Sequence, residues 1–237
     1  MAQADVVHVP APARRFIVPP ATKSGGLRLV FDVEADDLLD TATVIHCVVI
    51  VDLDSAQIFE YGPGQIADAL AHLARARYLT GHKIKNYDLR LLRRLYGWTP
   101  SANTEIVDTL VAGRLILPNI GDLDDQAAAM GGGALGKLRG RYSVEAWGVR
   151  LGVAKVGADI EDFSVWTPGL QARCVGDANT TKAIWHFIRP DGYSAQALEL
   201  EHRAEAVCDR IEADGVPPST TTRPGAWSGD GRRSAPS

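Results

Sequence analysis

Four acidic residues are the side chains of this sequence best suited to bind a metal ion. Asp32 and Glu34 lie two positions apart near the end of the first apolar segment, and alternate residues of a strand point to the same side of a sheet. Two carboxylates this close repel each other unless a cation lies between them, and hard oxygen ligands suit Mg²⁺ or Mn²⁺. Taken alone, the pair also fits a solvated strand end that continues into Asp36 and Asp37.

The other two acids, Asp88 and Asp177, lie in segments with helical patterns. Asp88 follows the sequence GHKIKNY at the start of a helix, where the helix dipole alone favours an acid. Asp177 lies between Cys174 and Thr181 on the apolar stripe of a long helix. An acid on such a stripe must be paired, protonated or bound to metal. Arg173, four residues earlier, is an alternative partner for it.

The elements that must position these acids follow from the apolar patterns. Short apolar runs predict strands at 27–33, 43–53, 57–61, 77–81 and 105–108. Helical spacing predicts helices at 65–76, 87–98, 109–117, 143–152, 168–190 and 194–215. The order predicts an α/β fold with a mixed β-sheet flanked by helices. The glycine-rich stretch 118–140 predicts a mobile loop or a weakly ordered insert.

Composition and charge exclude several classes of protein. The chain has 237 residues, of which 46% are hydrophobic and 23% charged, so a folded core is expected. Three cysteines without a CxxC pair argue against a disulfide scaffold or zinc ribbon and favour a reducing cytosol. No apolar run reaches the roughly 18 residues of a membrane span. The net charge of −4 argues weakly against nucleic acid as a partner.

The distribution of charge argues the other way. Between positions 75 and 94, seven basic residues accompany a single acid, Asp88. A local basic stretch attracts a polyanion whatever the total charge of the chain. It is equally consistent with solvated helix faces that bind nothing.

Taken together, the motifs resemble a known family. FDVE, GHKIKNYD and RCVGDANTTKAIW, in this order, resemble the DEDD superfamily of 3′–5′ exonucleases, whose fold is RNase-H-like. VDTLVAGRLI, YSVEAWGVRLG and LELEHRAEAVCDRIEADGVP extend the resemblance, over 27–217, to the proofreading domain of phage-type family A DNA polymerases.

The resemblance implies a site and a reaction. The four acids would be Asp32, Glu34, Asp88 and Asp177. They would hold two Mg²⁺ or Mn²⁺ ions and catalyse phosphodiester hydrolysis at the 3′ ends of single-stranded DNA. Five residues just before and within the predicted helix at 87–98 would contact the DNA strand. They are His82, Lys83, Lys85, Asn86 and Arg90.

Departures from the family pattern lower the expected activity. Lys83 stands where the family often has Asn. Arg173 replaces the Tyr that orients the attacking water, and Ala172 stands where another subgroup has His, so the third motif offers no general base. Arg173 can also pair with Asp177 and compete with Mg²⁺. We therefore expect a slow exonuclease; the alternatives are a catalytically degenerate remnant that binds single-stranded DNA or a polymerase, and an RNA-directed nuclease of the same fold.

Four segments are expected along the chain. They are an extended arm at 1–26, an exonuclease-like domain at 27–190, a helix at 191–216 that resembles the start of a polymerase region, and a disordered tail at 217–237. This order implies a chain truncated before the polymerase domain. A separate polymerase subunit is then a further expected partner, no membrane is expected, and the expected location is the cytoplasm of a bacterial or phage-infected cell.

Overall fold

A five-stranded mixed sheet forms the centre of the molecule. A computed structural model describes residues 26–153, 160 and 162–215, so the predicted arm and tail lie outside the described residues, apart from Gly26. The strands are β1 (Leu27–Ala35), β2 (Ile45–Asp52), β3 (Ile58–Tyr61), β4 (Ala76–Gly81) and β5 (Glu105–Asp108). Their order is β3-β2-β1-β4-β5. Pairs β1–β2 and β2–β3 are antiparallel, whereas β1–β4 and β4–β5 are parallel, which confirms the predicted mixed sheet.

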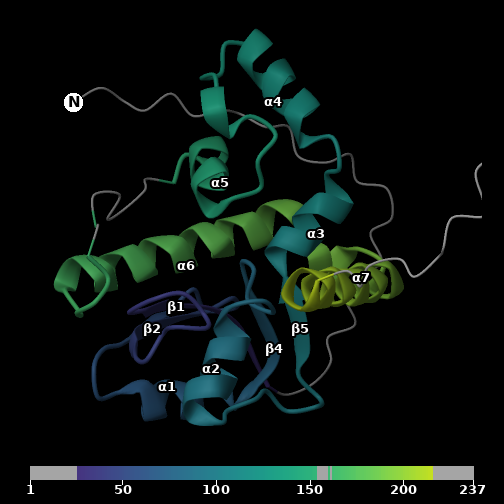
Figure 1. The fold of residues 1–237 in the computed structure, drawn as a ribbon. Helices are drawn as coiled ribbons and strands as arrows, with labels where there is room; N and C mark the ends of the chain where they lie inside the picture. The colour runs from purple at the N-terminus through teal and green to yellow at the C-terminus, as the bar shows by residue number, and fades with distance from the viewer. Residues whose placement is uncertain (1–25, 154–159, 161, 216–237) are drawn as a thin grey trace, which may run out of the picture.

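Helices cover both faces of this sheet (Figure 1). They are α1 (Ile66–Leu73), α2 (Asp88–Tyr96), α3 (Thr109–Ile116), α4 (Ile120–Ala129), α5 (Val144–Leu151), α6 (Pro168–Ile188) and α7 (Ala195–Asp214). The long helix α6 packs across β1 and β2, α1 packs on the other face, and α7 lies against α3. Among the described residues, no helix has the length and apolar character needed to cross a membrane.

The alternation of side chains along β1 carries the acids to α6. Val30 belongs to the same buried cluster as Cys174 of α6, whereas Phe31 belongs to the cluster on the opposite face. Asp32 and Glu34 continue the Val30 side of the strand, because alternate residues share a face. The Cys174 thiol donates a hydrogen bond of 3.4 Å to the Asp32 carbonyl oxygen, which fixes α6 against this part of β1.

The predicted loop at 118–140 is wrong in part, since it contains α4 and a short 3₁₀ helix (Gly136–Leu138). Asp124 of α4 anchors the segment. The Arg150 guanidinium donates to its carboxylate at 2.7 and 2.8 Å, with the two side chains only 0% and 2% exposed. The Gly140 N–H adds a bond of 2.8 Å. Ile120 and Ala127 are the other buried residues of α4, and the burial of Asp124 beside them requires this ion pair and these hydrogen bonds.

Candidate active site

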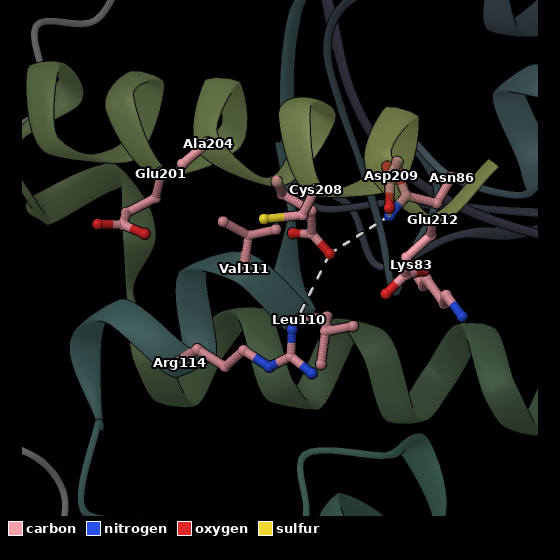
Figure 2. Close-up of a pocket in the computed structure, with 11 residues that line it drawn as sticks. Lys83, Asn86, Leu110, Val111, Arg114, Glu201, Ala204, Cys208, Asp209 and Glu212 are labelled. Atoms are coloured by element: carbon pink, nitrogen blue, oxygen red, sulfur yellow. Dashed lines mark hydrogen bonds and ion pairs between the residues drawn. The ribbon is translucent and has the colours of Figure 1, made fainter. Parts of the chain in front are cut away.

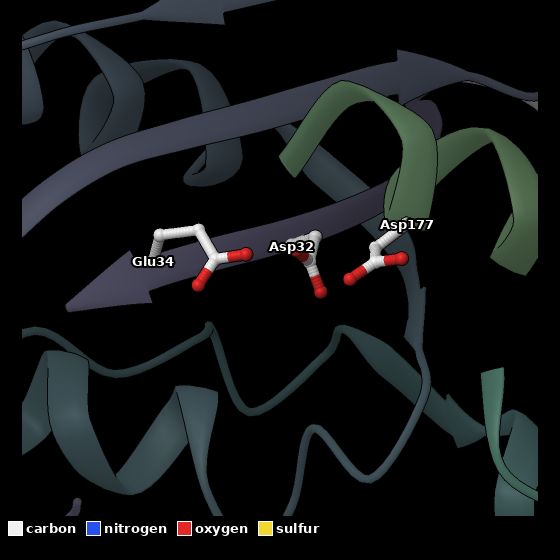
Figure 3. A group of neighbouring side chains, drawn as sticks. All are labelled: Asp32, Glu34 and Asp177. Atoms are coloured by element: carbon white, nitrogen blue, oxygen red, sulfur yellow. The ribbon is translucent and has the colours of Figure 1, made fainter. Parts of the chain in front are cut away.

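Three carboxylates converge where β1 meets α6. Asp32 and Glu34 of β1 and Asp177 of α6 each offer an oxygen, and these oxygens all lie within 4.8 Å of one another. Figure 3 shows Asp32 between the other two. The i, i+2 spacing on β1 and the place of Asp177 on the inner stripe of α6 produce this convergence. We call these three residues the carboxylate cluster.

Asp88 borders the carboxylate cluster without belonging to the group within 4.8 Å. It is the first residue of α2 and is 4% exposed. The backbone of Val33, the residue between Asp32 and Glu34, lowers the pKa of the Asp88 carboxyl group, which places that group next to β1. Its charge also raises the pKa of Asp32. The structure thus brings Asp88 to the edge of the cluster.

The four carboxylates carry more negative charge than their surroundings stabilise. Burial raises the pKa of Asp88 to about 8, with smaller contributions from the charges of Asp108 and Glu34. Burial, opposed by Arg173, raises the pKa of Glu34 to about 7. Burial, followed by the charges of Asp88 and Asp177, raises the pKa of Asp32. A cation offsets such repulsion, and an all-carboxylate donor set suits Mg²⁺ or Mn²⁺, so these residues fit the divalent ions that the sequence predicts.

Arg173 supplies an internal cation at the same place. Its Nε donates to Glu34 Oε1 at 3.0 Å and lies 3.8 Å from Asp177 Oδ2. Its guanidinium carbon lies 5.4 Å from the centroid of the Phe163 ring. The predicted pairing with Asp177 is confirmed, and the shorter contact with Glu34 is new. Part of the charge that a metal ion would neutralise is therefore already neutralised by the protein.

The raised pKa values predict how stability depends on pH without metal. Because Asp88 and Glu34 titrate near 8 and 7 in the folded protein against ordinary values of 3.8 and 4.5, the folded chain holds protons that the unfolded chain has released. Stability then falls as pH rises through the folded pKa values. In EDTA, we expect the melting temperature to decrease from about pH 7 to about pH 8.5. This range lies above the ordinary His pKa of about 6.5, near which the lowered pKa values of His82 and His202 oppose the decrease.

Asp88→Asn is the matched variant for this pH series. It removes the carboxyl group that has the higher pKa of the two, so the decrease in melting temperature should become shallower. A wild-type melting temperature that is constant or rises over the same range would contradict the assignment of the raised pKa values.

The residues proposed to meet DNA differ in their surroundings. Lys83 and Arg90 are exposed, whereas Lys85 is half-buried and burial lowers its pKa. The Nδ1 atom of His82 lies 2.9 Å from Thr109 Oγ1, and burial lowers the pKa of the ring to about 4, so His82 is uncharged near pH 7. Lys83 and Arg90 therefore offer the cations best placed to reach a phosphate.

Asn86, the fifth of these residues, has its side-chain amide engaged within the protein. The amide donates to Asp209 Oδ1 at 2.9 Å and to Glu205 Oε1 at 3.3 Å, both on α7. A strand of DNA would have to compete with these two carboxylates for the amide.

Asp108 is a buried acid near the site that the sequence analysis did not single out. It is 1% exposed and its carboxylate accepts the N–H groups of Lys83 at 2.8 Å and Leu110 at 2.9 Å. The second bond caps the N-terminus of α3. An Asp directly before a helical segment is a recognisable capping signal, but the bond to Lys83 joins the end of β5 to the loop before α2 and has no such signal.

Comparisons with known proteins agree with this geometry. No protein-family model matches the chain. The DNA-directed DNA polymerases of Escherichia phage T7 and Enterobacteria phage T3 are each 30% identical to it, over 80% of this chain and 33% of theirs. The chain thus spans about a third of the length of these relatives.

Two solved structures share the fold. One, described as the apo form of a nuclease, has a TM-score of 0.52 and 16% identity, covering 82% of this chain and 90% of its own. The other, Brucella melitensis NrnC bound to pGG, has a TM-score of 0.50 and 14% identity, covering 88% and 95%. The sheet and helices of this chain therefore have the RNase-H-like fold of these nucleases. The chain is therefore homologous to the T7 and T3 phage DNA polymerases over about a third of their length, and its fold is the RNase-H-like fold of nucleases.

Proposed function

We propose that the chain is a divalent-metal-dependent 3′–5′ exonuclease that removes nucleotides from the 3′ ends of single-stranded DNA. The observation that carries this proposal is the convergence of the Asp32, Glu34 and Asp177 carboxylates within 4.8 Å. Homology to phage DNA polymerases favours DNA as the substrate. The nuclease neighbour that is bound to pGG supports a short nucleic acid as the ligand of this fold.

The chain's own residues would divide the work as follows. The carboxylate cluster, with Asp88 at its edge, would hold two Mg²⁺ or Mn²⁺ ions, which supply charge stabilisation at the phosphate and lower the pKa of a bound water. The exposed Lys83 and Arg90, near the start of α2, would attract the phosphates of the strand. Arg173 would slow the reaction, because it shares Glu34 and Asp177 with the metal site.

The contact between Arg173 and Glu34 favours a second candidate function. With an arginine 3.0 Å from a metal ligand, the chain would bind single-stranded DNA or a polymerase as a catalytically degenerate remnant. Both candidates predict DNA binding, and only the first predicts turnover.

The distinguishing experiment is the degradation of a 5′-labelled single-stranded DNA with Mn²⁺. An exonuclease of the proposed polarity produces a ladder that shortens from the 3′ end, and a phosphorothioate linkage at that end delays it. An RNA strand of the same sequence tests the RNA-directed alternative. Binding without any shortening would establish the degenerate remnant, whereas internal cuts or shortening from the 5′ end would contradict the proposed polarity.

The outer face of α7 supports a polymerase-type domain as a partner. Leu200, Val207 and Ile211 fall on one stripe of this helix and are 63%, 45% and 47% exposed. About two thirds of the length of the relatives lies outside the part that this chain matches. The exposed stripe of α7 would pack against that part. Gel filtration with the other two thirds of a T7-type polymerase should show co-elution that Leu200→Asp with Ile211→Asp abolishes. Separate elution would show that the two chains do not bind each other. Co-elution that survives both substitutions would show that the contact lies away from this stripe.

A further inference from the structure

The loop that leads to Asp88 has a backbone that needs outside support. We call residues 81–87 the Asp88 loop. A side chain at Gly81 would bring a Cβ within 2.9 Å of the Phe31 carbonyl oxygen, so only glycine fits there. Lys83 has a φ of 66°, a left-handed conformation that costs free energy for a non-glycine residue and persists only where its surroundings enforce it. Tyr87, the N-cap residue of α2, provides no side-chain cap.

Asp108, at the end of the neighbouring strand β5, holds the first half of this loop. Its buried carboxylate accepts the Lys83 N–H at 2.8 Å and the Lys85 N–H at 3.4 Å. The first of these bonds lies at the residue with the left-handed backbone. Asp108 therefore enforces the strained conformation.

Helix α7 in turn holds Asp108. The Nε2 atom of His202 accepts the backbone N–H of Asp108 at 3.0 Å, and His202 is 6% exposed. The ring must be neutral to accept this bond. Burial lowers the pKa of His202 to about 4, which keeps the ring in that form at neutral pH.

The same helix holds the second half of the loop directly. Asp209 Oδ1 and Glu205 Oε1 accept the side-chain amide of Asn86 at 2.9 and 3.3 Å (Figure 2). These residues line a groove of about 350 Å³ between the loop, α3 and α7. Asn86 lies two positions before Asp88, so this contact fixes the chain immediately before the acid.

We propose that α7 is the element that positions Asp88, because it holds both halves of the Asp88 loop: the first through His202 and Asp108, the second through Asp209 and Asn86. This inference rests on the proposed exonuclease function, in which Asp88 borders the metal site. His202, Asp209 and Asn86 act through the loop and are therefore positioning residues. Displacing a reacting group by about 1 Å can lower a rate by about 100-fold, so a loosened loop is expected to slow turnover more than it weakens substrate binding.

Asp209→Ala tests this proposal from the α7 side, because it removes the nearer of the two acceptors for Asn86, at 2.9 Å against 3.3 Å for Glu205, and leaves the loop sequence intact. We expect hydrogen exchange of the amides at 82–88 to increase by about tenfold, the effect of losing one hydrogen bond to a charged group. We also expect kcat for single-stranded DNA to fall by about tenfold or more while KM stays within about twofold.

Two variants separate positioning from a general loss of charge or stability. Asp209→Asn keeps an oxygen that can accept from Asn86 and should restore both exchange and kcat. Glu212→Ala removes a neighbouring charge from the same groove and should change neither. Unchanged loop exchange in Asp209→Ala, or faster exchange with an unchanged kcat, would overturn the inference. Failure of the proposed function is distinguishable from failure of this inference, because the wild-type chain itself would then show no turnover. In that case α7 would have no catalytic role.

Discussion

Asp32→Asn is expected to reduce Mn²⁺-dependent degradation of single-stranded DNA by at least about 100-fold, since charge stabilisation by bound metal is worth several kcal/mol. Asp32 lies between Glu34 and Asp177 (Figure 3) and is the one member of the carboxylate cluster that the other acids surround. Removing it deprives a divalent ion of its central ligand. Burial raises the pKa of Asp32, so the neutral amide suits this environment and the variant should fold.

Asp40→Asn is the matched control for this loss. Asp40 is an exposed acid that follows β1, and its replacement makes the same change of charge. Degradation rates should be equal for this variant and the wild type. If Asp32→Asn retains a rate within about threefold of wild type, a difference worth less than 1 kcal/mol, the carboxylate cluster is not the centre of the reaction.

Replacing Arg173 with Tyr is expected to raise both Mn²⁺ affinity and turnover. The arginine donates a 3.0 Å bond to Glu34 and lies 3.8 Å from Asp177, so a metal ion must displace it to use both ligands fully. A hydrogen bond between charged groups is worth about 1.5–3 kcal/mol, and its removal should increase Mn²⁺ affinity by about tenfold or more. Calorimetric titration measures this change independently of any activity.

Arg173→Leu separates the two effects of that substitution. Both variants remove the competing charge, but only Tyr adds a hydroxyl that can orient water. Mn²⁺ affinity should therefore rise in both, and turnover should rise further in Arg173→Tyr. Unchanged Mn²⁺ affinity in both variants would show that Arg173 does not compete with the metal ion. Unchanged turnover in Arg173→Tyr would show that Arg173 is not what limits the rate of the wild-type chain.

Local patterns were sufficient to predict the elements that carry the acids. The alternation along β1 places Asp32 and Glu34 on one face, and the helical stripe of α6 places Asp177 toward the sheet. Both regularities depend only on near neighbours in the sequence. The pairing of Arg173 with Asp177 has the same origin, because residues four apart adjoin on a helix.

Contacts between distant segments had no such signal. The bond from Arg173 to Glu34 depends on how α6 lies across β1, which no local spacing specifies. Helix α4 was missed although Ile120 and Ala127 are buried on it, because its glycine-rich surroundings obscure this short stripe and the ion pair that anchors Asp124 comes from the distant Arg150. The support of the Asp88 loop by α7 likewise joins polar residues from remote parts of the chain, such as Asn86 and Asp209.

The most direct test of the metal site is anomalous diffraction from crystals of the chain grown or soaked with Mn²⁺. The account predicts anomalous density bounded by the carboxylates of Asp32, Glu34 and Asp177, and its absence from crystals of Asp32→Asn. Crystals that bind Mn²⁺ only elsewhere, at a concentration that supports degradation in solution, would contradict it.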